Sequence, residues 1–136
     1  MAEMKIVYLA DTEVVTFGAD ATYRPILGDA EGGFPIRTGI QTSQPGYEAP
    51  LHSHPYTEIL HVLEGRAEAW LEGQEAHPTP LGPGDTIAIP PDTRHAFRVV
   101  GDTPMRLLGT HLSPRRIVSY ADGSETDARG YRVGDA

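Results

Sequence analysis

The sequence contains no cysteine, which excludes both disulfide bonds and thiolate metal ligands. Basic residues are also scarce, since 11 Lys and Arg stand against 19 Asp and Glu, giving a formal net charge of −8. Nucleic-acid binding relies on clustered basic residues, so we predict no nucleic-acid partner. The nearest basic cluster, Arg115-Arg116, is expected to lie in a solvated turn or a local salt bridge.

Long hydrophobic runs are missing as well. No apolar segment approaches the roughly 18 residues needed to span a membrane. Residues 1–10 contain charged positions around a very short apolar stretch, which makes a poor signal peptide. These absences predict a soluble, cytoplasmic protein with no membrane partner.

Glycine and proline are abundant, with 15 and 12 residues, and they divide the chain into short segments. Apolar runs and polar–apolar alternation predict β-strands over residues 5–9, 34–42, 58–63, 66–71, 86–89, 95–100 and 105–112. The two strands that flank Glu64-Gly65 are predicted to form a hairpin. No long segment has helical periodicity, so we predict an all-β sandwich or barrel.

The remaining segments are less regular. Residues 11–29 are expected to form an edge strand and a loop, residues 116–120 one more strand, and residues 124–136 a loosely held tail. The sequence leaves the roles of residues 11–33 and of the tail open. No linker or repeat divides the chain, and we predict a single domain over residues 1–136 with its core at about 34–112.

Two histidines separated by one residue are the strongest functional signal. His52 and His54 lie on an extended segment, where side chains at i and i+2 point to the same face. Glu58 has the same parity and joins them if that strand continues, while His95 is the candidate for a fourth ligand. Imidazoles together with a carboxylate are a typical ligand set of a mononuclear transition-metal site.

The same residues resemble the two conserved motifs of the cupin superfamily. The first motif is matched at every spacing by Gly46, His52, His54, Glu58 and Gly65. The second is matched by Gly84, Pro90 and His95. Asp92 stands where the motif usually has Gly, and Val99 where it usually has Asn, and neither departure touches the ligand set.

The resemblance implies a double-stranded β-helix, the cupin jelly-roll barrel, with a metal near one mouth. It also implies that His52, His54, Glu58 and His95 are the ligands of one divalent ion. Fe, Mn, Ni, Cu and Zn are all compatible with three imidazoles and one carboxylate, and the identity of the metal stays open. Two coordination positions of an octahedral ion would remain free for water, dioxygen or a chelating substrate.

Two further residues are candidates for catalysis. Tyr56 lies between His54 and Glu58 with the same parity, and its hydroxyl is a candidate to orient a substrate or a metal-bound water. His111 lies on the last predicted strand and is a candidate general base, or a hydrogen-bonded barrel histidine. Phe97 shares the parity of His95 and is expected to form an apolar wall of the pocket.

The function predicted first is a metal-dependent dioxygenase that acts on a small oxygenated or aromatic molecule. One alternative is a metal-dependent isomerase, cyclase or lyase that uses no oxygen and relies on His111 or Tyr56 for proton transfer. The other is a non-catalytic barrel that binds a small molecule, because a fold does not fix a function. By resemblance and from the exposed edges of residues 5–9 and 116–120, we also expect a homodimer.

Overall fold

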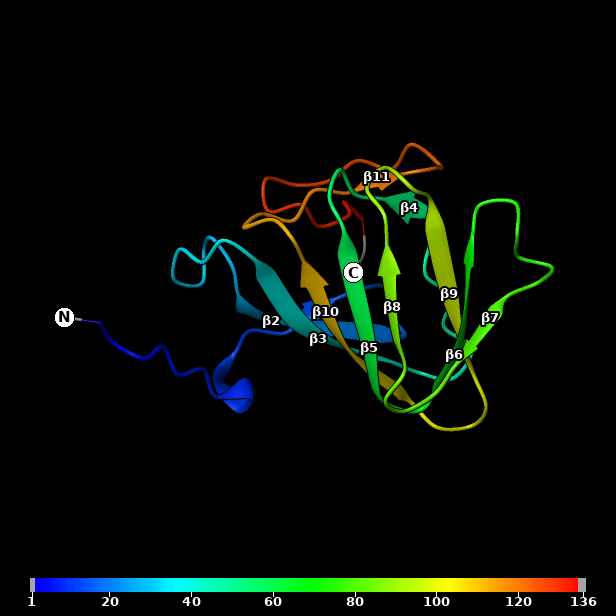
Figure 1. The fold of residues 1–136 in the computed structure, drawn as a ribbon, viewed down its shortest axis with the longest axis horizontal. Helices are drawn as coiled ribbons and strands as arrows, with labels where there is room; N and C mark the ends of the chain where they lie inside the picture. The colour runs from blue at the N-terminus through cyan, green and yellow to red at the C-terminus, as the bar shows by residue number, and fades with distance from the viewer. Residues whose placement is uncertain (1, 135–136) are drawn as a thin grey trace.

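The computed structural model describes residues 2–134, which form two antiparallel sheets and the 3₁₀ helix Leu9–Asp11 (Figure 1). One sheet has the order β1-β2-β3-β10-β5-β8, and the other has the order β11-β4-β9-β6-β7. The strands of the six-stranded sheet are β1 (Val15–Thr16), β2 (Ala21–Leu27), β3 (Arg37–Ser43), β5 (Glu58–Glu64), β8 (Thr86–Ile89) and β10 (Met105–His111). Those of the five-stranded sheet are β4 (His52–Ser53), β6 (Arg66–Leu71), β7 (Thr79–Leu81), β9 (His95–Val100) and β11 (Ser119–Tyr120). This arrangement is a jelly-roll β-barrel, and the predicted all-β fold class is confirmed.

The two sheets pack face to face through apolar side chains. Burial alternates along β5 and β10, so that every second residue points inward, as the period of a strand requires. The buried core takes members from both sheets, namely Leu60, Val62, Ile89, Met105 and Leu107 from one and Ala67, Ala69, Phe97 and Val99 from the other. The barrel is therefore filled by the inward faces of strands that the sequence pattern already indicated.

The predicted hairpin at Gly65 is wrong. β5 pairs with β10 and β8, whereas β6 pairs with β7 and β9, so the chain changes sheets at this glycine. Gly65 has φ of 79°, and a Cβ there would lie 2.4 Å from the main-chain oxygen of Pro104. Only glycine fits such a close left-handed corner. A hairpin turn also favours glycine, so the sequence alone does not distinguish the two.

The N-terminal predictions are only partly correct. Residues 5–9 form no strand, and Met4, Ile6 and Tyr8 are exposed in a segment that runs away from the sheets (Figure 1). The expected edge strand within residues 11–29 exists as β1, but β2 lies inside the sheet between β1 and β3. β2 tolerates Pro25 because β1 covers only Thr22 and Tyr23 of it and the register with β3 shifts after Pro25. None of residues 2–134 belongs to a helix long and apolar enough to cross a membrane.

The C-terminal segment is packed onto the barrel rather than loosely held. Tyr131 is buried, and its ring lies 6.3 Å from that of Tyr23 and 6.2 Å from that of Phe17. Its hydroxyl accepts a hydrogen bond of 2.8 Å from Arg37 Nη2. Residues 135–136 of the expected tail lie outside the described residues. The polar composition of this segment gave no indication that Tyr131 would be buried against the barrel.

Candidate metal centre

The four predicted ligands come from both sheets and meet between them. His52 of β4 lies directly opposite His95 of β9 in the five-stranded sheet, and His54 follows β4. Glu58 begins β5 in the other sheet. The strand of the histidines does not continue to Glu58, because the chain turns at Pro55 and crosses the barrel before β5 begins. Glu58 faces the histidines across the barrel instead of standing beside them.

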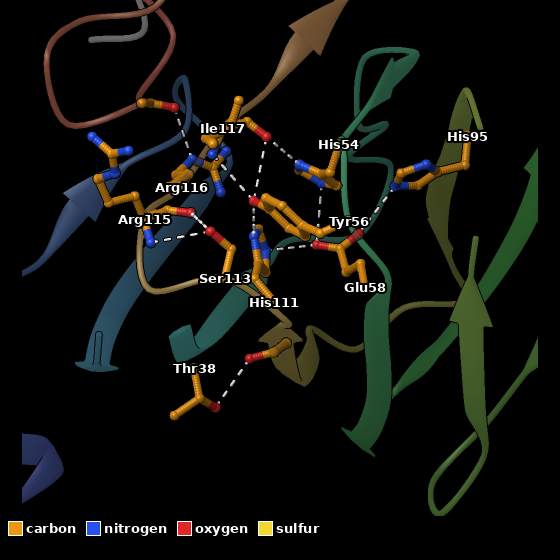
Figure 2. Close-up of polar contacts among 12 residues, drawn as sticks. Thr38, His54, Tyr56, Glu58, His95, His111, Ser113, Arg115, Arg116 and Ile117 are labelled. Carbon is orange, nitrogen blue, oxygen red and sulfur yellow. Dashed lines mark hydrogen bonds and ion pairs between the residues drawn. The ribbon is translucent and has the colours of Figure 1, made fainter. Parts of the chain in front are cut away.

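The side chains nevertheless converge. One ligand atom from each of His52, His54, Glu58 and His95 lies within 4.8 Å of all the others. His54, Glu58 and His95 are buried, and His52 is partly buried. Glu58 Oε1 lies 3.0 Å from His95 Nε2, and Glu58 Oε2 lies 3.4 Å from His54 Nε2 (Figure 2).

The main chain sets the orientation of all three imidazoles. The Nδ1 atoms of His52, His54 and His95 lie 2.6, 2.7 and 2.9 Å from the carbonyl oxygens of Pro50, Ile117 and Thr93. A carbonyl only accepts hydrogen bonds, so each Nδ1 carries a proton and donates it. In the neutral rings the lone pair is then on Nε2, which is the atom that points into the cluster.

This donor set fits a divalent transition metal. Three Nε2 lone pairs and a carboxylate repel one another unless a cation lies between them. His54 Nε2 is buried and has no hydrogen-bond partner within the described part of the chain, as expected for an atom that waits for a metal. Carbonyl bonds to the other ring nitrogen are the usual outer contacts of metal-binding histidines.

Burial and hydrogen bonding tune the charges of the cluster. Burial, reinforced by the neighbouring His95, lowers the pKa of His52 from 6.5 to about 3. Burial by itself would raise the pKa of Glu58, but the hydrogen bond from His111 and the neighbouring rings of His54 and His95 hold it well below its usual range. His52 is thus a neutral imidazole and Glu58 a carboxylate at neutral pH, which are the forms that bind metals.

His111 and Tyr56 form a hydrogen-bonded chain that ends at Glu58. His111 Nε2 lies 2.7 Å from Glu58 Oε2, and its Nδ1 lies 2.5 Å from the hydroxyl of Tyr56 (Figure 2). Since the carboxylate accepts, His111 donates from Nε2 and accepts the Tyr56 O–H at Nδ1. The hydroxyl also accepts the N–H of Ile117 at 3.1 Å. His111 thus has the opposite tautomer from the three ligand histidines.

A cavity opens onto this cluster. His111, His52, Glu58 and His95 line it, whereas Tyr56 lies behind His111 and does not reach it. The other walls are mostly aromatic or apolar and comprise Phe17, Tyr23, Gln41, Tyr47, Ala49, Pro50, Leu60, Phe97, Leu107, Gly109, Arg116 and Tyr120. Phe97 lies in the wall where strand parity placed it.

Several wall residues were not predicted from the sequence. Phe17 and Tyr23 come from the segment whose role was open, and Tyr120 comes from β11. Arg116 was expected in a solvated turn but lines the cavity. Their spacing gave no signal that these residues would meet the ligands, because they lie far from the ligands in the sequence.

Comparison with known proteins identifies the family. The family model described as "Cupin domain" matches residues 39–111. Protein SchB of Streptomyces halstedii is 37% identical over 111 residues, which cover 79% of this chain and 75% of that protein. Polyketide synthase CurC of Streptomyces cyaneus is 40% identical over 91 residues, covering 66% of this chain and 54% of that protein. The chain belongs to the cupin family.

A solved structure agrees with this assignment at the level of the fold. The polyketide cyclase RemF from Streptomyces resistomycificus superposes with a TM-score of 0.73 and 22% sequence identity. The match covers 95% of this chain and 91% of that one. The match therefore extends well beyond the residues that the family model covers.

Proposed function

We propose that this cupin is a metal-dependent cyclase, isomerase or lyase that uses no dioxygen and acts on a small molecule rich in carbonyl or enol oxygens. The observation that carries this proposal is the chain from Tyr56 through His111 to Glu58 in the wall of the ligand cavity. Reactions of this kind need a group that moves protons next to the metal. A dioxygenase, the function predicted first, can also use such a group, so the choice between the two functions depends on the similar proteins.

The ligands in this proposal are His52, His54, Glu58 and His95. A divalent ion held by them would supply Lewis-acid polarisation of a substrate oxygen. The chain itself holds the ligands in place, because every imidazole is tied to a carbonyl and Glu58 is tied to His111. Fe, Mn, Ni, Cu and Zn all remain compatible with this set.

His111 is the proposed acid–base residue and Tyr56 its positioning residue. Burial lowers the pKa of His111, so at neutral pH the ring is uncharged and ready to accept a proton. The Tyr56 hydroxyl can turn its proton from His111 Nδ1 to the carbonyl of Ile117, 3.3 Å away. Because Tyr56 occupies Nδ1 on the side away from the cavity, proton exchange with a substrate would take place at Nε2, which lies beside Glu58 at the cavity wall.

The similar proteins support this choice between the alternatives. CurC is named a polyketide synthase, and RemF, which shares the fold, is named a polyketide cyclase. A cyclisation of a polyketide-like chain requires enolisation and water loss, which are proton transfers. The aromatic walls provided by Phe17, Tyr47 and Phe97 suit the flat products of such a reaction.

We also propose that the protein is a homodimer, with a cytoplasmic location as the sequence predicts. Met4, Ile6 and Tyr8 are 84, 60 and 68% exposed in the N-terminal segment. Exposed apolar side chains that are close together in sequence are typical of a contact with another molecule. Light scattering of the full chain beside a variant that carries Ser at these three positions tests the dimer.

The function is tested under argon with protein purified without a metal-affinity tag. Metal content is measured first, and the Zn-, Mn-, Ni- or Fe-loaded protein is then given a linear triketone. NMR follows deuterium exchange at the activated carbon and ring closure. We expect turnover without oxygen, and a loss of about 100-fold or more in His111→Gln. His61→Gln is the matched control, because His61 lies outside the ligand cavity and its ring bonds Thr86 instead of a member of the cluster.

Two results would contradict the proposal. Product that forms only in air, with stoichiometric oxygen uptake, would return the assignment to a dioxygenase. A protein that takes up none of these metals would overturn the ligand set and leave a binding barrel.

A further inference from the structure

Arg116 is held in an aromatic cage at the wall of the ligand cavity. Its guanidinium carbon lies 5.1 Å from the ring centre of Phe17, 5.3 Å from that of Tyr131 and 6.0 Å from that of Tyr23. A guanidinium at such distances is attracted to the ring faces. Phe17 lies between β1 and β2, Tyr23 lies on β2 and Tyr131 follows β11, so this cage exists only in the folded chain.

The main chain fixes the same side chain a second time. Arg116 Nε donates to the carbonyl of Gly130 at 3.0 Å (Figure 2). Gly130 has φ of 82°, and a Cβ there would lie 2.0 Å from the Arg116 carbonyl oxygen, so the tail can approach this closely only with glycine. One edge of the guanidinium is thus used, and both terminal NH₂ groups remain as donors.

Among the residues that the structure describes, Arg116 has no carboxylate partner, unlike Arg37, another arginine that lies against the ring of Tyr131. Ion pairs hold Arg37, Arg94, Arg98, Arg106, Arg129 and Arg132. Within residues 2–134, no Asp or Glu lies at ion-pair distance from Arg116. In a chain with a formal charge of −8, an arginine that is caged and left unpaired is a candidate to bind an anion from outside.

The other charges of the cavity favour the same ligand. Glu58 is the one carboxylate among the described lining residues, and its oxygens already face His111, His54 and His95. A divalent metal on the proposed ligands exceeds the charge of Glu58 by one, and Arg116 adds another positive charge. A ligand that lies across the cavity would therefore meet positive charge at two points.

We propose that Arg116 binds an anionic oxygen, a carboxylate or an enolate, of the molecule that occupies this cavity. This assignment rests on the proposed function. It specifies a substrate that binds the metal through its oxygen atoms and carries a further negative charge that Arg116 binds. Arg116 determines specificity and position in this scheme, and His111 keeps the proton-transfer role. The guanidinium is suited to this because it is planar, permanently charged and already oriented by the cage.

The test compares salicylate, which is anionic at neutral pH, with salicylamide, its neutral analogue. Titration calorimetry measures both ligands on zinc-loaded and on metal-free protein. We expect Arg116→Gln to weaken salicylate binding about tenfold or more and salicylamide binding by less than about threefold. Arg116→Lys should keep part of the preference, because it keeps the charge without the planar fork. Arg115→Gln is the matched control and should bind like the original protein.

Other outcomes would overturn the assignment. These are a wild-type protein that prefers salicylamide, and an Arg116→Gln variant that keeps its salicylate affinity or loses both ligands equally. Equal loss would indicate that Arg116 only holds the tail. A wild-type protein that takes up no zinc refutes the metal proposal instead, while the metal-free titrations still measure what Arg116 contributes.

Discussion

The two ends of the barrel interior are built on the same strands and have opposite chemistry. β5 carries Glu58 at one end of its inward face and Val62 near the other, and β9 carries His95 and then Val99. β10 runs the other way, from Met105 to His111. The inward-facing residues of the same strands are therefore apolar at one end, where they stabilise the sheets. At the other end they are polar and form the candidate metal site.

The comparison shows how stability and function are divided. Val62 and Met105 are less than 2% exposed, and dispersion and burial hold them without directional bonds. The polar end is equally buried but depends on hydrogen bonds with fixed partners, such as those of His54 and His111. Substitutions at the two ends should therefore change different measured quantities.

The largest effect is expected at the apolar end. Met105→Ala removes a fully buried side chain and should lower the free energy of unfolding by about 2–5 kcal/mol. Urea denaturation measures this change, and zinc affinity of the folded protein should stay within about threefold. Leu63→Ala, at a position that is 38% exposed, is the control and should cost less than about 1 kcal/mol. Loss of zinc binding in folded Met105→Ala would show that the two ends are coupled.

Substitution of a proposed metal ligand should have the opposite effect, changing zinc affinity much more than stability. His95→Ala removes one of the four proposed ligands and should weaken zinc binding by more than about 100-fold, beyond the range of outer-contact substitutions. Calorimetry with zinc measures the affinity, and the mid-point of metal-free unfolding checks the fold. His77→Ala, a histidine outside the cluster, is the control. An unchanged zinc affinity in His95→Ala would remove this residue from the ligand set.

A smaller effect is expected behind the cavity wall. Tyr56→Phe removes the donor to His111 Nδ1 and the acceptor of the Ile117 N–H, at a cost of about 1–3 kcal/mol in unfolding free energy. Activity should fall mainly in kcat, because Tyr56 does not line the cavity. Its pKa, raised by burial to about 12, keeps the hydroxyl protonated, so this loss should not vary with pH below neutrality. A rise in KM alone would place Tyr56 at the substrate instead.

The effect that is absent at neutral pH, and therefore ranks last, is a difference in pH dependence. The folded-state pKa of His52 is about 3 and its ordinary value is 6.5, so below pH 6.5 the unfolded chain binds a proton that the folded chain does not. Metal-free protein should therefore lose stability progressively as the pH falls from about 6.5 towards 3. Melting temperatures across this range should fall less steeply for His52→Gln. Met105→Ala should lower the whole curve without changing its slope, and an equal slope in His52→Gln would contradict the assignment.

Much of the barrel could be predicted from the sequence because its strands are short, alternating and bounded by Gly or Pro. The prediction matched β6, β8 and β9 residue for residue. β2 was missed because Pro25 and the nearby glycines look like loop signals, and β7 because it is short and contains Pro80. The partner of a strand was harder to predict, and the hairpin error at Gly65 shows why. A left-handed glycine marks a sharp corner but does not say whether the next strand returns to the same sheet.

The sequence by itself determined the spacing of His52, His54, Glu58 and His95, the i and i+2 spacing that turns His52 and His54 to one face, and membership of the cupin family. Only the tertiary structure decided that Glu58 faces the histidines from the other sheet, that His111 holds Glu58, and that Arg116 reaches the cavity. Spacing along one strand fixes direction through local geometry. Contacts between segments far apart in the chain depend instead on which sheets pack together, and local sequence patterns do not encode that choice.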